Sequence, residues 1–163
     1  QRQMCIRDSY RIRIKRVDRG YLTEKEIATI AEKEFPTKRL EQVRDIFIFS
    51  CYTGLAYIDI KELKKEHIQT SFDGNQWIMT HRHKTGTPVN VPLLAIPQGL
   101  IKKYEGQAKD GLLFPVLSNQ KMNAYLKEIA VVCGIEKNIT FHCGRHYELS
   151  LSLNLNSLQR FVS

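Results

Sequence analysis

The segment spanning residues 140–146 brings together residue types that could act on a phosphate group. His142 and Arg145 are three positions apart, so they share one face of a helix that begins near Thr140. The planar guanidinium of arginine can hold two phosphate oxygens at once, and an imidazole can move protons near neutral pH. On its own, such a pair is most often an ordinary surface feature. The segment predicts a phosphate clamp if the rest of the chain supplies a matching context.

A second group of cations lies in residues 66–93, where the hydrophobic pattern has the period of a strand. An Asp-Gly and a Thr-Gly turn divide this stretch into three predicted antiparallel strands: residues 67–72, 76–83 and 89–93. Because side chains alternate between faces along a strand, Arg82 and Lys84 are expected to point from one face at a hairpin tip. Lys84, His142 and Arg145 are the residue types that stabilise the negative charge of a phosphodiester during transfer.

The elements that must position these residues are mostly helices. Capping signals and apolar periodicity predict five helices: residues 23–35, 37–52, 56–63, 97–104 and 118–133. The second helix ends in an almost wholly apolar stretch and should be buried centrally, and Gly54 and Gly134 mark helix ends. The predicted fold class is mainly α with a small three-stranded antiparallel β-sheet, an α+β arrangement.

The size and composition of the chain place it among globular proteins. Its 163 residues fit one domain, and 42% hydrophobic and 26% charged residues are ordinary proportions. The sequence contains no apolar run long enough to span a membrane and no signal peptide, so we expect a cytoplasmic protein without a membrane partner. Four scattered cysteines are expected to be reduced thiols.

Net charge points to a polyanionic partner, but the charge is unevenly distributed. Residues 1–20 carry seven basic and two acidic side chains, which gives +5 of the total +8. This segment is either a basic arm that follows a phosphate backbone or a solvated tail. Residues 1–9 also resemble a translated sequencing-adapter remnant. The rest of the chain is mildly basic, so its DNA contacts are expected to be local.

The order of these elements resembles the catalytic domain of the tyrosine recombinases, the phage-integrase family of mobile-element integrases. Four stretches carry the likeness: residues 53–59 (Thr-Gly-Leu-Ala-Tyr-Ile-Asp), 83–86 (His-Lys-Thr-Gly), 117–126 (Leu-Ser-Asn-Gln-Lys-Met-Asn-Ala-Tyr-Leu) and 140–146 (Thr-Phe-His-Cys-Gly-Arg-His). Each piece is weak alone, and their joint occurrence over residues 21–146 is what makes the resemblance specific.

The resemblance implies a reaction and its partners. Members of the family cut one DNA strand when a tyrosine hydroxyl attacks the scissile phosphate, and they hold a 3′-phosphotyrosyl link until a 5′-hydroxyl reverses the step. It therefore implies double-stranded DNA as partner and self-association on DNA in the full-length form. It implies no nucleotide cofactor and no metal, because the bond energy is stored in the covalent link.

The resemblance also implies residue roles. Lys84 would donate a proton to the departing 5′ oxygen, while Arg145 would stabilise the five-coordinate phosphorus and His142 would assist proton movement. Asp59 matches the acidic residue that organises the first loop. Three neighbours of these residues are DNA-binding candidates: Arg82, Thr85 and His146.

One departure from the family lies at Ala56, where the family usually has the arginine of Thr-Gly-Leu-Arg. Alanine cannot hold a phosphate oxygen, and losing one oriented donor costs on the order of a hundred- to a thousand-fold in rate. Either another cation replaces the arginine or the clamp is half built. Arg82, expected on the same hairpin face as Lys84, is the candidate substitute.

The two ends of the chain also depart from the family. Residues 147–163 change from a helical pattern to a strand-like alternation of leucine with serine and asparagine, as in a frame-shifted tail. Tyr147 is too close to Arg145 to reach a phosphate held there, so we expect it to be a packing residue. Relatives also place a DNA-clamping domain ahead of the basic arm. We therefore expect residues 1–20 to form an arm, 21–146 a catalytic-domain core and 147–163 an aberrant tail.

These departures predict an incomplete, non-cleaving fragment that still binds DNA weakly. Three alternatives belong to other classes. The first is a non-enzymatic DNA-binding module derived from an integrase, and the second is an incomplete reading frame that folds poorly. The third is a zinc hydrolase or nuclease, for which the ligand types present fit no closed tetrahedral spacing: His81, His83, Cys133, His142, Cys143 and His146.

Overall fold

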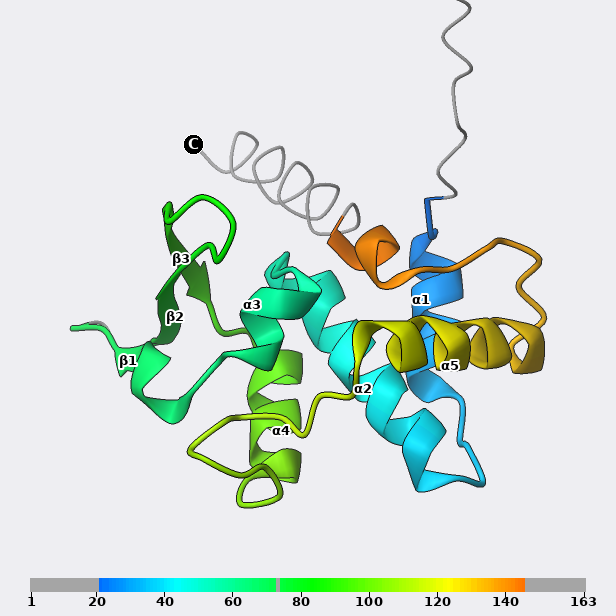
Figure 1. Cartoon of the computed structure of the whole chain (residues 1–163), viewed down its shortest axis with the longest axis horizontal. Helices are drawn as coiled ribbons and strands as arrows, with labels where there is room; N and C mark the ends of the chain where they lie inside the picture. Colours follow the sequence, from blue (N-terminus) through cyan, green and yellow to red (C-terminus); the bar gives the residue numbers. More distant parts are fainter. Residues whose placement is uncertain (1–20, 73, 146–163) are drawn as a thin grey trace, which may run out of the picture.

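The computed structural model describes residues 21–72 and 74–145 (Figure 1). Its helices are α1 (Glu24–Glu32), α2 (Lys38–Thr53), α3 (Tyr57–Lys61), the 3-10 helix η1 (Lys65–His67), α4 (Ala95–Tyr104) and α5 (Asn119–Val132). Its strands are β1 (Ile68–Thr70), β2 (Gln76–His81) and β3 (Pro88–Pro92). The expected fold class, mainly α with a three-stranded antiparallel sheet, is confirmed. None of the helices in the described ranges is long and apolar enough to cross a membrane.

α2 forms the centre of the fold, as its apolar C-terminal half predicts. It packs against α1, α4 and α5, and Phe47 and Phe49 near its end are fully buried. The helix ends at Gly54, whose φ of 65° lies in the left-handed region that glycine adopts without strain. The chain therefore leaves the core abruptly and enters α3, which the sequence predicted over a longer stretch.

Local sequence signals set the ends of the flanking helices. Thr23 and Glu26 form the predicted capping box of α1, in which each side chain accepts a hydrogen bond from the other residue's backbone N–H. Ser118 caps α5, and Gly134 follows that helix with a φ of 70°. α4 begins at Ala95, two residues before the expected start at Pro97, because proline is tolerated in the first turn of a helix.

The sheet has the order β1-β2-β3, and both pairs are antiparallel. It lies at the opposite end of the molecule from α1 and α5 (Figure 1). Ile78 of β2 is fully buried, whereas its neighbour Met79 is exposed, as alternation between sheet faces requires. β2 ends at His81 rather than at residue 83, and β1 ends at Thr70 rather than at residue 72, so the predicted strands were too long.

Candidate functional site

The helical turn over residues 141–145 carries the two residues of the predicted phosphate clamp. Its first residue, Phe141, is buried, and its ring makes edge contacts with Phe47 of α2 and Tyr57 of α3. The ring centroids are 6.0 Å and 5.9 Å apart, within the range in which edge-to-face pairs are stabilising. The residue directly before His142 is thus held between two helices of the core.

A close backbone approach fixes the other end of this turn. A Cβ at Gly144 would lie 3.3 Å from side-chain atoms of three α2 residues: Phe47, Ser50 and Cys51. Burial, with a further contribution from Cys143, raises the pKa of the Cys51 thiol, which therefore stays protonated as an uncharged packing group. Glycine lets the turn rest directly on α2, and Arg145 follows immediately.

Beside the turn lies a pocket of about 270 Å³. Nine residues line it: Ala56, Tyr57, Ile58, Asn119, Asn123, Thr140, Phe141, His142 and Arg145. His142 is exposed and Arg145 is partly exposed, so both can be reached by a ligand from solvent. The pocket therefore joins the predicted His-x-x-Arg pair to the loop that contains Ala56.

Asp59 connects that loop to the β2–β3 hairpin. Its side chain is 3% exposed and accepts hydrogen bonds from Ala56 N (3.3 Å), His83 N (3.0 Å) and Arg82 Nη1 (3.2 Å). Arg82 Nη1 also donates to the carbonyl oxygen of Gly54 at 3.1 Å. The Arg82 guanidinium is therefore held against the segment that contains Ala56. At this position the family that the sequence resembles usually has an arginine.

Solved structures of similar fold include site-specific recombinases. XerH recombinase bound to its difH substrate in a pre-cleavage complex superimposes with a TM-score of 0.66 at 20% identity, over 82% of this chain and 43% of XerH. The lambda integrase catalytic core gives 0.60 at 17% identity, over 78% of this chain and 83% of the core. XerA recombinase gives 0.57 at 18% identity, over 82% and 50%. This chain has the tyrosine-recombinase catalytic-domain fold.

The remaining comparisons set the extent of that likeness. No protein-family model matches the sequence, and the search of curated proteins gives no match. The chain spans half or less of the length of XerH and XerA, and most of the lambda catalytic core. The correspondence is therefore one of fold, within the catalytic domain of these recombinases.

The recombinase-fold hairpin differs from the sequence prediction in one important way. Arg82 and Lys84 were expected to point from one strand face, but β2 ends at His81 and Lys84 lies in the exposed turn over residues 83–85. Arg82 turns inward instead, because the buried carboxylate of Asp59 binds it. Thr85 is also exposed, and its hydroxyl lies 2.8 Å from that of Thr87 across the turn.

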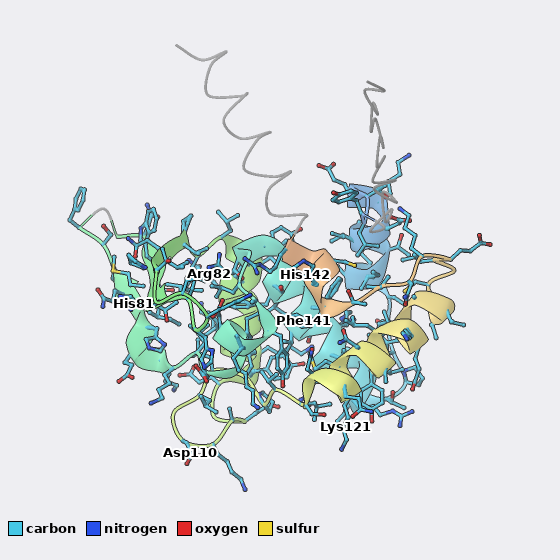
Figure 2. The ribbon with its side chains drawn as sticks, turned by 45° about the horizontal axis from the view of Figure 1, so that its top comes forward. His81, Arg82, Asp110, Lys121, Phe141 and His142 are labelled. Atoms are coloured by element: carbon cyan, nitrogen blue, oxygen red, sulfur yellow. The ribbon has the colours of Figure 1, made fainter. Side chains whose placement is uncertain are left out.

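Arg82 and His142 lie on the same side of the molecule, opposite Asp110 (Figure 2). The β2–β3 turn and the 141–145 turn are likewise both on the upper side in Figure 1. The fold thus places the two turns on the same side of the molecule (Figure 1). His146, Tyr147, the tail to residue 163 and the arm over residues 1–20 lie outside the described residues.

The candidate zinc ligands lie on separate elements. His81 and His83 belong to the hairpin, and His83 Nε2 lies 3.5 Å from a carboxylate oxygen of Glu62. His142 and Cys143 belong to the turn beside α5. In the described ranges, no group of three or more histidine, cysteine, aspartate or glutamate side chains is placed to hold a metal ion.

Asn119 and Asn123 form the α5 wall of the pocket and were not predicted as site residues from the sequence. A signal for them was present, because residues four apart share a helix face and both flank the buried Met122. Two carboxamides beside the apolar stripe of a helix indicate a polar partner across that face. Asn123 has such a partner in the backbone of Phe141.

Proposed function

We propose that this chain is the catalytic-domain part of a tyrosine-recombinase-type enzyme of DNA integration or site-specific recombination, and that it binds double-stranded DNA. The observation that carries the proposal is the pocket that unites His142 and Arg145 with the Ala56 loop. A protein of similar fold, XerH, has been solved bound to its difH substrate, which supports a role for this pocket in receiving a phosphate of the duplex. Positioned cations are what phosphodiester transfer requires most from a protein.

The proposed roles follow from where each group lies. Arg145, held by a turn that rests on α2, would bind the non-bridging oxygens of one phosphate, and His142 beside it would help move a proton. Lys84, on an exposed turn, would reach the departing 5′ oxygen from the side of the hairpin. Thr85 would contact the neighbouring backbone, as would His146, which follows Arg145 in the sequence.

Arg82 is the proposed replacement for the arginine missing at Ala56. Its guanidinium is already oriented by the Asp59 carboxylate and the Gly54 carbonyl, two residues from Ala56 in sequence. A guanidinium has five N–H donors, so two hydrogen bonds from one nitrogen leave donors for a phosphate oxygen. Because Asp59 also accepts a hydrogen bond from Ala56 N, it links Arg82 to the wall of the pocket.

We further propose that the 163-residue polypeptide does not itself cleave DNA. The first tyrosine after Arg145 is Tyr147, which is too close in sequence to swing onto a phosphate that Arg145 holds. Incubation with a nicked recombination substrate should therefore give no protein–DNA adduct that survives denaturation. A phosphotyrosyl adduct would contradict this part of the proposal. Self-association on DNA is proposed for the full-length form.

DNA binding is tested with a fluorescent duplex and variants that each remove one positive charge. We expect Arg145→Ala to weaken duplex affinity roughly fivefold or more, because one phosphate contact is lost. For the same reason, the slope of log affinity against log salt concentration should become shallower by about one. Lys109→Ala is the matched control, since Lys109 is exposed and precedes Asp110, on the opposite side of the molecule from His142 (Figure 2). Equal losses in the two variants would contradict a phosphate site at Arg145.

A further inference from the structure

Asn123 lies beside the buried face of α5. Its neighbours Met122 and Leu126 are fully buried, and α5 packs along α2. The backbone at Asn123 is therefore fixed by the core, and its side chain is partly buried against the segment that follows Ile139. A polar group in such a position is expected to have a partner, because burying a carboxamide without hydrogen bonds is unfavourable.

The partner of Asn123 is the first N–H of the 141–145 turn. Asn123 Oδ1 accepts a hydrogen bond from Phe141 N at 2.8 Å, across 18 residues of sequence. The first N–H groups of a helical turn have no acceptor within the turn, and Phe141 is buried, so water cannot easily replace this bond. The bond joins α5 to the residue directly before His142.

This bond also fixes which way the carboxamide points. A backbone N–H can only donate, so the atom of Asn123 that faces Phe141 must be the oxygen. Asn123 Nδ2 then donates to Asn119 Oδ1 at 3.3 Å, one turn back along α5. Both asparagines line the pocket with His142 and Arg145.

We infer that Asn123 is a positioning residue for the phosphate site: its hydrogen bond to Phe141 N holds the His142–Arg145 turn at the distance from α5 at which the pocket exists. The hydrogen bond itself is part of the structure, whereas its effect on phosphate binding rests on the proposed function. A site that stabilises developing charge loses much of its effect when the donors shift by about 1 Å, so the anchor of the turn acts on phosphate binding through Arg145.

The anchors of the turn are not interchangeable. The aromatic contacts of Phe141 hold its side chain, and Gly144 allows the approach to α2, but neither fixes the first N–H of the turn. Without the Asn123 oxygen, the N–H of Phe141 has lost its acceptor. The backbone of the turn is then expected to shift until this N–H reaches another acceptor. A role limited to stability would lower the melting temperature without changing phosphate binding by the folded protein.

The experiment compares Asn123→Ala with Gln120→Ala at a temperature where both variants are folded. Asn123→Ala should accelerate hydrogen exchange of the Phe141 amide roughly tenfold and weaken duplex affinity by about the same factor as Arg145→Ala. Gln120→Ala removes an exposed carboxamide of the same helix that does not line the pocket, and it keeps the bond to Phe141. It should leave Phe141 exchange unchanged and change duplex affinity by less than about twofold.

Asn123→Asp covers the case in which the alanine variant does not fold. Aspartate keeps an oxygen acceptor for Phe141 N, so slow exchange of that amide and the native chemical shifts of Arg145 should persist. Loss of either in a folded Asn123→Asp protein would overturn the inference, as would wild-type duplex affinity in Asn123→Ala. If instead Arg145→Ala binds DNA like wild type, the proposed function fails, while Phe141 exchange still tests the positioning of the turn.

Discussion

The two segments that carry the candidate catalytic cations are held in different ways. The 141–145 turn is anchored by a buried aromatic ring, by a backbone contact with α2 and by a hydrogen bond to α5. The β2–β3 turn is anchored at its base, where Asp59 binds Arg82 and His83 N, and its tip residues Lys84 and Thr85 are exposed. One segment is part of the core, and the other projects from it.

This difference suggests a division of labour within the proposed site. Donors that bind a phosphate are most effective when their positions are fixed before the ligand arrives, which fits the turn of Arg145. A group on an exposed turn with few buried contacts can change position at low energetic cost, which fits a lysine that approaches a leaving group after the duplex has bound. Substitutions at the anchors of each segment can test this contrast.

The largest effect is expected at Asp59, the anchor of the hairpin. Asp59→Ala would leave Arg82 and two backbone N–H groups without their shared acceptor, and we expect a loss of about 3 kcal/mol, because breaking a buried charged pair is costly. Chemical denaturation measures the loss. Asp59→Asn keeps one acceptor oxygen and should lose less. If the two variants were equally stable, the carboxylate charge would not be what holds the hairpin.

Glycines of the two segments provide a second comparison. Gly144→Leu would force a side chain against Phe47, Ser50 and Cys51, and overpacking of this kind costs about 2 kcal/mol. Gly86→Leu on the hairpin meets nothing within 4 Å, and its cost of about 1 kcal/mol comes from a φ of 66°. Thermal unfolding measures both losses, and duplex affinity of the folded Gly144 variant should also fall. Equal affinity in both variants would contradict a core-anchored phosphate site.

Much of the fold could be predicted from sequence because its signals are local. The capping box at Thr23, the left-handed glycines after α2 and α5, and the two hairpin turns each act within a few residues of where they occur. The site was predicted less completely. The His142–Arg145 pair could be identified from its spacing, and both residues line the same pocket.

The parts that could not be predicted depend on contacts between distant segments. Strand alternation predicted that Arg82 and Lys84 point from one face, but β2 ends at His81, and Arg82 binds the buried carboxylate of Asp59, 23 residues away. Asn123 is an unremarkable helix residue until Phe141 is placed beside it, 18 residues later. The need for glycine at position 144 likewise depends on how closely the turn approaches α2.

The smallest effect on stability is expected at Lys84, which lies on the exposed tip of the hairpin rather than against the core. Lys84→Ala should change the free energy of unfolding by less than about 0.5 kcal/mol, because the side chain is exposed on a turn. Duplex affinity should still fall about two- to threefold, since one cation near the backbone is removed. Lys84→Arg keeps the charge and should restore affinity. A lysine that contributed to stability but not to DNA binding would mean that the hairpin tip packs on the protein rather than facing the duplex.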